Sequence, residues 1–279
     1  MREIDVSLVE ETVRALFLRA CCEIGEDVLS CLREGLKAEE SPFGREALRQ
    51  LVENDEIAAK TQMPICQDTG MAVVFLDVGQ DVHFVGGDVN DAIERGVRWA
   101  YRDGCFRASV LDPLTRVNTG DNTPAVVHTR IVPGENVEIT AAPKGFGSEN
   151  MSRLWMLTPA QGVEGVKNAV VETVRQAGGN PCPPVVVGVG IGGTAERAML
   201  MAKHSLTRDC GELSPDAELA AMEQELLRRI NDLGIGPQGL GGRITALAVH
   251  IEKSPTHIAG LPVAINMQCH AARHKSAII

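Results

Sequence analysis

The pattern of apolar residues changes near Met71, and this change limits which folds the chain can adopt. Residues 1–60 carry apolar side chains near helical spacing, and Ser7–Glu10 forms a capping-box pattern that opens the first predicted helix. From Met71 onward, short β-rich runs alternate with glycine turns and with further helical segments. The mixture predicts an α/β (mixed α+β) fold: one large domain over residues 1–279, with a helical N-terminal part at 1–60 and a mixed sheet in an α/β part at 61–279.

Periodicity and turn residues place the individual elements. The first helix is expected to run from Ser7 past Val28, and a second to cover Arg45–Lys60. Pro215 is expected in the first turn of a later helix, because proline lacks the N–H that this position leaves unsatisfied. The other predicted helices are 89–101, 163–177, 195–206 and 214–233, and the predicted strands are 73–76, 125–128, 137–140, 185–188, 245–251 and 261–266.

Composition narrows the class of protein. The chain has 279 residues, 44% of them hydrophobic, which is enough for a large core, and its net charge of −10 argues against a general nucleic-acid binder. It has no run of 18 apolar residues and no signal-like N-terminus, so we expect a cytoplasmic protein with no membrane segment. Its eight cysteines are then expected to be thiols or ligands, and Cys21, Cys22 and Cys31 to be core or surface thiols of the first helix.

Three other cysteines stand in settings that a packing role does not require. Cys66 precedes an Asp-Thr-Gly turn, Cys182 is flanked by prolines that fix the backbone, and Cys269 opens a polar segment. Their separations match no Cys-x-x-Cys metal motif. Two interpretations therefore stay open, a shared metal site or three unrelated loop thiols. Three thiolates on a four-iron cluster would leave one iron open to act as a Lewis acid.

Candidate groups for binding an anion lie in three segments. Lys144–Asn150 combines a cation with a glycine turn whose N–H groups can face a carboxylate, although an ordinary turn into the next helix is the alternative. Arg107 can form a forked pair with a carboxylate, or it can be a surface arginine. Asn118–Pro124 is rich in turn formers and is either a binding loop or a connection.

Asp68 and His257 are the candidates for proton transfer. Asp68 is the carboxylate nearest in sequence to the Cys66 segment, and its alternative role is to hold the turn at Thr69 and Gly70. His257 can contact a substrate or move a proton, although a lone histidine is often structural.

The glycines of Gly188–Gly193 fit the G-x-G-x-x-G fingerprint of dinucleotide-binding folds. Asp209 lies near the position of the acidic ribose contact, but residues 210–215 after it indicate a loop and not a second strand. We therefore favour a strand, turn and helix with close backbone packing. A nicotinamide-dependent oxidoreductase stays as a minor alternative function.

These segments together closely resemble the α subunit of two-subunit class I fumarate hydratases and of the related L-tartrate dehydratases, which are iron–sulfur hydro-lyases. The resemblance implies reversible hydration of fumarate to L-malate on a catalytic [4Fe–4S] cluster, with dehydration of L-tartrate to oxaloacetate as the nearest alternative. It also makes 61–279 the cluster- and substrate-binding part. The similar stretches are Pro64–Gly70, Arg107–Val110, Asn118–Pro124, Lys144–Asn150, Pro181–Thr194, Gly236–Gly242 and His257–Arg273.

The resemblance further implies roles for single residues, in three groups. The implied cluster ligands are Cys66, Cys182 and Cys269. The implied substrate contacts are Gln67, Arg107, Gly145, Phe146 and Gly147, with Phe146 standing where some relatives have glycine. The implied acid–base and substrate-contacting residues are Asp68 and His257, with Lys144, Arg273 and Lys275 as weaker candidates.

The resemblance also implies a partner. In single-chain relatives a second, C-terminal domain closes the active site and supplies the proposed base, and no stretch of these 279 residues resembles it. We therefore expect a separate β subunit in an α2β2-like assembly, a small dicarboxylate substrate, and no nucleic-acid or membrane partner. The alternative from another class is a non-catalytic iron–sulfur or zinc module with His270 as a fourth ligand.

Overall fold

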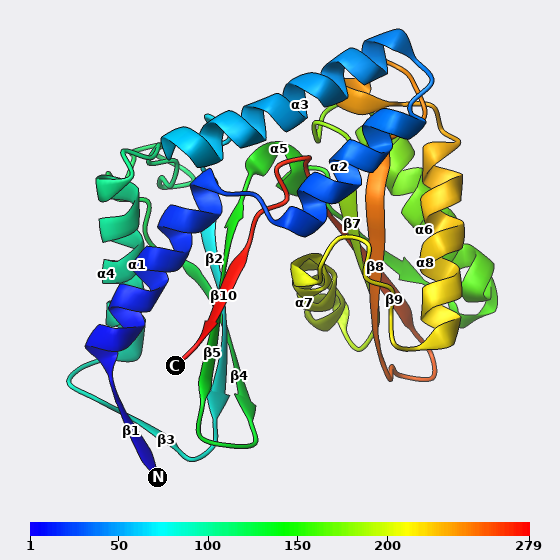
Figure 1. Ribbon diagram of the computed structural model, residues 1–279. Coiled ribbons are helices and arrows are strands. Elements are labelled where there is room, and N and C mark those ends of the chain that lie inside the picture. The colour runs from blue at the N-terminus through cyan, green and yellow to red at the C-terminus, as the bar shows by residue number, and fades with distance from the viewer. The chain divides into compact units, whose positions relative to one another are not determined.

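The computed structural model describes residues 1–279, and the chain divides into two compact units, each built from separate stretches of sequence (Figure 1). Unit 1 comprises Met1–Ile24, Asp55–Phe146 and Arg273–Ile279, and unit 2 comprises Gly25–Asn54 and Gly147–Ala272. Residues 1–60 therefore contribute to both units. Each unit has a four-stranded mixed sheet with helices, so the predicted mixed α/β class is confirmed.

Unit 1 consists of two packed helices on a mixed sheet. Its elements are β1 (Arg2–Asp5), α1 (Val6–Cys22), β2 (Met71–Gly79), β3 (Val82–Val85), α4 (Val89–Asp103), β4 (Val126–Val132), β5 (Val137–Lys144) and β10 (Lys275–Ile278). The sheet order is β10–β5–β2–β4, in which only the β2–β4 pair is parallel. Helices α1 and α4 pack on each other and share one core with this sheet, while β1 and β3 form a separate parallel pair (Figure 1).

The core of unit 1 follows from two periodicities. Alternate residues of β2, such as Val74 and Leu76, point into the core that α1 and α4 share with the sheet, because side chains of a strand alternate between its faces. On the helices the buried residues are spaced by four, as Val13 and Phe17 are on α1. Cys21 is fully buried in this core, and burial raises the pKa of its thiol to about 12. It is therefore a packing cysteine, as predicted.

Two predictions for the N-terminal helices are wrong in detail. Asp5, not Ser7, caps α1, because the Asp5 carboxylate accepts the N–H of Ser7 at 2.8 Å. The first helix ends at Cys22, and α2 (Glu26–Ala38) begins after an extended Gly25, so Cys31 belongs to α2. The acidic residues that open α2 favour a helix start there, since they complement the positive end of its dipole.

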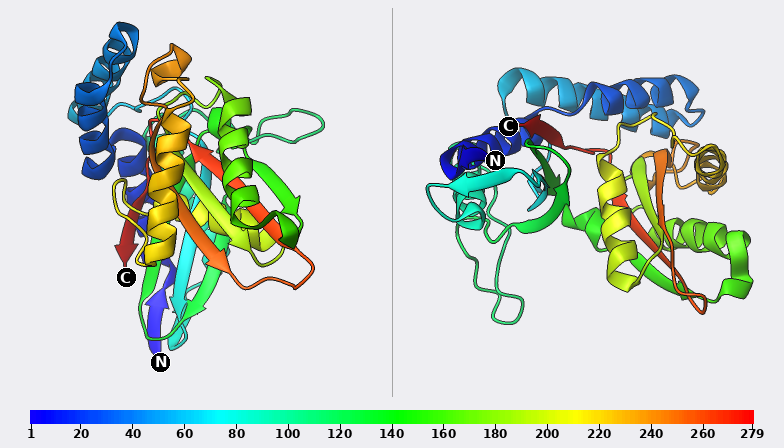
Figure 2. Two further views of the ribbon diagram at one scale, coloured as in Figure 1. Left: turned by 90° about the vertical axis from the view of Figure 1, so that its right-hand side faces the viewer. Right: turned by 90° about the horizontal axis from the view of Figure 1, so that it is seen from below.

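Unit 2 is a sheet between helices. Its elements are α2, β6 (Arg153–Leu157), α6 (Gly162–Ala177), β7 (Val185–Gly192), α7 (Ala195–His204), α8 (Ala217–Asn231), β8 (Ala246–Ser254) and β9 (Leu261–Gln268). The strand order is β6–β9–β7–β8, and β7 runs parallel to β8 and antiparallel to β9. Helices α6 and α8 pack on one face and α7 packs on the other (Figure 2). Helix α3 (Pro42–Thr61) begins in unit 2 and ends in unit 1.

Strand β7 explains the glycine pattern. Val185, Val187 and Val189 face the core of α6 and α8, so Gly188 and Gly190 face α7. A Cβ added at Gly188 would lie 2.0 Å from the Ala202 carbonyl oxygen, and one at Gly190 would come equally close to the α7 backbone. These glycines therefore allow α7 to lie directly on the strand, which confirms the close-packing interpretation of Gly188–Gly193.

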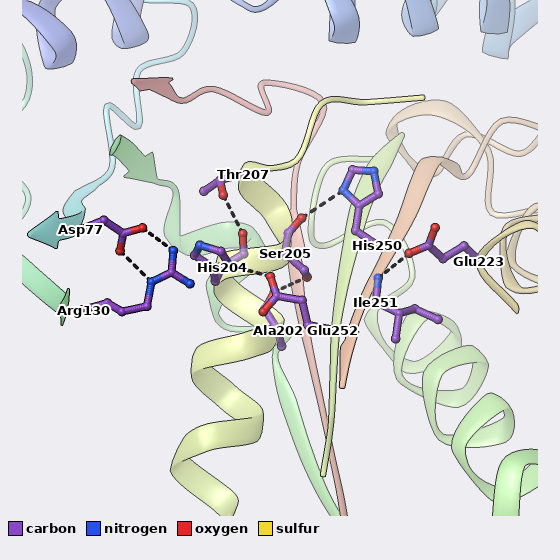
Figure 3. A network of polar contacts seen from close by, with 10 residues as sticks. All are labelled: Asp77, Arg130, Ala202, His204, Ser205, Thr207, Glu223, His250, Ile251 and Glu252. Carbon is purple, nitrogen blue, oxygen red and sulfur yellow. Dashed lines mark hydrogen bonds and ion pairs between the residues drawn. The ribbon is translucent and has the colours of Figure 1, made fainter. Parts of the chain in front are cut away.

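Polar groups fasten α7 and α8 to strand β8 (Figure 3). His204, at the end of α7, bonds through Nδ1 to a Glu252 carboxylate oxygen at 2.6 Å. The buried His250 of β8 places its Nδ1 3.1 Å from the Ser205 carbonyl oxygen. Glu223 of α8 is almost fully buried and accepts a main-chain N–H of β8 at 2.8 Å. Buried polar groups that are bonded in this way fix the position of each helix.

Most of the other predicted elements are confirmed within a few residues, with exceptions at short strands. Pro215 lies before α8 and not in its first turn, since the cap is Asp216. The short strands β1, β3, β6 and β10 were not predicted. None of the helices is at once long enough and apolar enough to span a bilayer.

Candidate active-site elements in the two units

Cys66 lies in a turn of unit 1 that is closed by its own polar groups. Its Sγ accepts the Asp68 N–H at 3.4 Å. The Asp68 carboxylate accepts two further main-chain N–H groups, from Gly70 at 3.0 Å and from Phe146 at 2.8 Å. The half-buried sulfur is therefore presented next to an amide donor, an environment that suits a thiolate ligand.

Tyr101 and Asn122 hold this turn from its buried side. The Tyr101 hydroxyl donates to the carbonyl oxygens of Thr69 at 2.8 Å and Gly70 at 2.9 Å, and the Asn122 amide donates to the Gly70 carbonyl at 3.2 Å. Burial raises the pKa of Tyr101 well above its usual range, so the hydroxyl keeps its proton and stays a donor. Neither residue was predicted, although Tyr101 is the only tyrosine of the chain and Asn122 lies in a segment that the sequence singled out.

Backbone fit and a buried cation complete the turn. Gly70 has φ of +81°, and a Cβ there would lie 2.7 Å from the Lys144 nitrogen, so glycine is required. Arg273, which is only 3% exposed, donates to the Asp68 carbonyl oxygen. The structure thus places Arg273, a weaker candidate in the sequence, against the backbone of the turn.

Arg107 follows α4 and lies beside the same turn. Its carbonyl oxygen accepts the Thr69 hydroxyl at 3.1 Å, and the N–H of Ser109 donates to the Asn122 side chain at 2.7 Å. The Arg107 guanidinium is exposed and makes no hydrogen bond or ion pair within the chain. A guanidinium with a fixed backbone and no internal partner is available to bind an external carboxylate.

The predicted glycine loop joins the turn through Asp68. A Cβ at Gly145 would lie 3.3 Å from an Asp68 carboxylate oxygen, and the Phe146 N–H is the one that this carboxylate accepts. Lys144 is 3% exposed, and its Nζ donates to the Gly145 carbonyl at 3.2 Å. The loop leads directly into the short helix α5 (Phe146–Glu149), so the alternative of a turn into a helix also holds. The boundary between the units falls after Phe146.

In unit 2 the structure brings Cys182 and Cys269 to one edge of the sheet. Cys182 precedes β7 and Cys269 follows β9, and these strands run antiparallel. The N–H of His270 donates to the Cys182 carbonyl oxygen at 3.3 Å. Cys182 is exposed and has φ of +55°, so its side chain stands out from a tight turn. The sequence suggested a constrained loop here, and the structure has one.

Main-chain groups hold the Cys182 turn. The Cys182 N–H donates to the Gly179 carbonyl at 3.1 Å. The Pro183 carbonyl oxygen accepts two bonds from Gln238, one from its main-chain N–H at 2.7 Å and one from its side-chain amide at 2.8 Å. The peptide bond between Pro183 and Pro184 is cis.

A polar network that was not predicted anchors the second half of the glycine loop in unit 2. Glu149 accepts from Lys203 of α7 at 2.5 Å and from the Asn266 amide of β9 at 2.9 Å. The same amide donates to the Ser152 hydroxyl at 2.8 Å, and Asn266 is fully buried. Asn266 precedes Cys269 by three residues, so one side chain links the segment after Gly147 to the strand that ends just before this cysteine.

His257 is exposed in the loop between β8 and β9. Its Nδ1 accepts the N–H of Ala259 at 3.2 Å. The neutral ring therefore carries its proton on Nε2, which leaves that N–H as a donor.

The two units divide the predicted site residues between them. Unit 1 contains Cys66, Gln67, Asp68, Arg107, Gly145 and Phe146, and unit 2 contains Gly147, Cys182, His257 and Cys269. Neither unit alone contains the three cysteines. No group of three or more His, Cys, Asp or Glu side chains lies close enough together in this structure to hold a metal ion.

Comparison with known proteins identifies relatives along nearly the whole chain. The family model described as fumarate hydratase (Fumerase) matches residues 10–278. A protein of Methanocaldococcus jannaschii named "Putative L(+)-tartrate dehydratase subunit alpha" is 46% identical over 271 residues, which cover 95% of this chain and 95% of that protein. The L(+)-tartrate dehydratase subunit alpha of Escherichia coli O157:H7 is 32% identical over 258 residues, covering 91% of this chain and 85% of its own length. The protein of the same name from Shigella boydii serotype 4 shows the same identity and coverage.

Proposed function

The chain belongs to the fumarate hydratase (Fumerase) family of hydro-lyases, and from this premise we propose that it is the α subunit of an iron–sulfur enzyme that hydrates fumarate to L-malate. The observation that carries the proposal is the turn of unit 1, in which one hydrogen-bonded frame joins the Cys66 sulfur, the Asp68 carboxylate and the main chain of Arg107, whose guanidinium has no partner within the chain. A metal ligand, a carboxylate and an anion-binding cation on one frame suit a dicarboxylate substrate.

We propose Cys66, Cys182 and Cys269 as the ligands of a [4Fe–4S] cluster. The donor set fits this group: all three are thiol sulfurs, the Cys66 sulfur accepts an amide N–H, and the exposed Cys182 lies at the same sheet edge as Cys269. When bound, a cluster with three protein thiolates supplies an open iron that acts as a Lewis acid toward the departing or arriving hydroxyl.

The residues of this chain would bind and orient the substrate. The Arg107 guanidinium would fork onto one carboxylate, and main-chain N–H groups of Gly145–Gly147 would hold it in place. Gln67 is exposed directly after Cys66, so its amide would reach a substrate bound at that turn. Phe146 is 45% exposed and would shape the substrate side of the loop.

Asp68 and His257 are proposed to handle protons. Each Asp68 carboxylate oxygen accepts one main-chain N–H and keeps a second lone pair, which leaves capacity to accept a substrate proton. The His257 Nε2 N–H would donate to a substrate oxygen. The base that exchanges the C3 proton of malate is proposed to be a hydroxyl group on another subunit.

That subunit is proposed to be a β chain in an α2β2-like assembly. The proposal is supported by relatives whose names describe them as subunit alpha. The assembly is proposed to act in the cytoplasm, where the eight cysteines of this chain would stay reduced.

L-Tartrate is the second candidate substrate, and the names of the relatives favour it. Dehydration of tartrate to oxaloacetate uses the same chemistry on a substrate with one more hydroxyl. Within this chain, Phe146 and the Asn118–Thr123 segment are where we expect the two substrates to be distinguished.

The test is fumarate hydration after anaerobic iron–sulfide reconstitution, followed as loss of fumarate absorbance. The chain is assayed alone and with its β subunit, and L-tartrate is assayed in parallel. Fumarate turnover that needs the β subunit supports the proposal. Turnover of tartrate alone would keep the cluster and Arg107 assignments and replace the substrate. A reconstituted complex that binds iron but turns over neither substrate would overturn the enzymatic proposal in favour of a binding module.

A further inference from the structure

Two cysteines of unit 2 outside the proposed site form a close thiol pair. Cys31 lies on α2, and Cys210 lies in the segment that follows α7. The two thiols interact closely enough that each shifts the pKa of the other. A Cβ at Gly211 would lie only 3.7 Å from the Cys31 sulfur, so this sulfur is packed directly against the backbone that carries Cys210.

A second bond fixes the Cys210 segment on the same helix. The N–H of Cys210 donates to an Asp27 carboxylate oxygen at 2.8 Å. Asp27 and Cys31 are four residues apart, so they share one face of α2. The segment is therefore attached to this face one helical turn from Cys31, and both cysteines are free thiols.

The two thiols differ in exposure and acidity. Cys31 is half-buried, whereas Cys210 is 8% exposed. The interaction with the Cys210 thiol lowers the pKa of Cys31, although burial and the carboxylates of Glu34 and Asp27 oppose this. The interaction with Cys31, together with burial, raises the pKa of Cys210. Cys31 is thus the better nucleophile, and Cys210 is a neighbouring thiol that stays protonated.

We propose that Cys31 and Cys210 form a dithiol site that reduces hydroperoxides and is left as a Cys31–Cys210 disulfide. The Cys31 thiolate attacks the terminal oxygen of the hydroperoxide, the O–O bond breaks, and the alkoxide leaves as an alcohol after taking a proton. The Cys210 sulfur then attacks the sulfenic sulfur of Cys31, and water leaves as the S–S bond forms. Two thiols and one hydroperoxide give one disulfide, one alcohol and one water, and an external dithiol returns the site to its reduced form.

A metal site at the same place is the competing interpretation, and the structure disfavours it. No third His, Cys, Asp or Glu side chain completes a ligand group with the two thiols. The carboxylate of Asp27, which contacts this segment, is already bonded to the Cys210 N–H. Simple packing also leaves the half-buried position of Cys31 unexplained, since a packing thiol is normally fully buried, as Cys21 is.

The test uses the full-length, cluster-free chain carrying Cys66→Ser, Cys182→Ser and Cys269→Ser, so that the proposed cluster ligands take no part. The reduced protein is exposed anaerobically to one equivalent of hydrogen peroxide and then alkylated, and tandem mass spectrometry of its peptides locates any crosslink. We expect a Cys31–Cys210 disulfide to form at least about tenfold faster than the exposed Cys105 is oxidised, and dithiothreitol to reverse it.

Two variants resolve the order of steps. In Cys210→Ser, Cys31 should stop at sulfenic acid, which dimedone traps; in Cys31→Ser, Cys210 should stay reduced. Cys105→Ser is the control and should leave disulfide formation unchanged. Oxidation of Cys105 at the same rate, a crosslink of Cys31 to Cys21 or Cys22, or two thiols that stay reduced would overturn the proposal. If either variant fails to fold, the crosslink measurement on the chain that keeps both Cys31 and Cys210 still decides the proposal.

Discussion

The turn around Cys66 in unit 1 and the turn around Cys182 in unit 2 both present a cysteine, but different groups hold them. Buried side chains from distant segments hold the first, namely Tyr101, Asn122 and Arg273. Flanking prolines and main-chain hydrogen bonds hold the second, and two of these bonds come from the distant residues Gln238 and His270. The first turn should therefore be sensitive to single side-chain substitutions, and the second should tolerate them.

The difference suits the proposed roles. The Cys66 turn must also position Asp68 and the Arg107 segment, so its supports tie several segments together. The Cys182 turn only has to present one sulfur at a sheet edge. A turn with one task can be fixed by prolines and main-chain groups, whereas a turn with several tasks needs side chains from several segments.

The largest expected effect comes from removing the proposed ligand thiolate of either turn. In Cys66→Ser and Cys182→Ser, reconstituted anaerobically with the β subunit, we expect at least about a 1,000-fold loss of hydro-lyase turnover, because the Lewis-acidic iron is no longer held. Iron content and cluster absorbance should fall with activity. Cys105→Ser, at an exposed cysteine outside the proposed ligand set, is the control and should keep both. Full turnover in either ligand variant would remove that cysteine from the proposed site.

The second-largest effect separates substrate binding from structural support within unit 1. In Arg107→Met we expect KM for fumarate to rise about 30-fold, because one charge-assisted bond to a carboxylate is lost. Stability should change little, since the guanidinium makes no bond within the chain. Arg116→Met, at an exposed arginine of the following loop, should leave KM unchanged. A loss of kcat at constant KM would instead place Arg107 in the chemistry.

The sequence predicts the constrained setting of Cys182 better than it predicts the supports of the Cys66 turn. Proline and glycine fix φ locally, so the constrained setting of Cys182 can be predicted from its neighbours alone. The supports of the Cys66 turn lie about 30 to 200 residues away in sequence, and nothing near Cys66 indicates that Tyr101 or Arg273 will meet it. Local periodicity in the same way found helix α4 and strand β7, whereas the short edge strand β6 depends on its pairing with β9.

The N-terminal misassignments have the same origin. A capping-box pattern at Ser7 and continued apolar spacing past Gly25 are both locally consistent with one long helix. The packing of α1 against α4 in unit 1 and the place of α2 in unit 2 require a break there, and an extended Gly25 provides it. The pairing of Cys31 with Cys210 could not be predicted from the sequence either, because it depends on that break.

A third effect tests the supports of the Cys66 turn. In Tyr101→Phe we expect a loss of about 2 kcal/mol in the free energy of unfolding, because the buried Thr69 carbonyl loses its main donor. The rate at which a thiol reagent modifies Cys66 should rise in the cluster-free chain. Thr173→Val removes a buried hydroxyl of unit 2 that accepts the Trp155 N–H, so it should destabilise the chain without changing the Cys66 rate. Equal rates in the two variants would mean that Tyr101 does not hold the turn.

The smallest effect is expected at the Cys182 turn, and it decides whether the comparison holds. In Gln238→Ala the side-chain bond to the Pro183 carbonyl is lost, but the main-chain bond at 2.7 Å stays, so the loss of stability should be below about 1 kcal/mol. Gln238→Gly should be close to neutral, because φ of +53° favours glycine and offsets the missing amide. Urea unfolding of both variants beside Tyr101→Phe gives the measurement. A loss in Gln238→Ala as large as that in Tyr101→Phe would show that the Cys182 turn also depends on a side chain, because the main-chain bond would then be too weak to keep Pro183 in place.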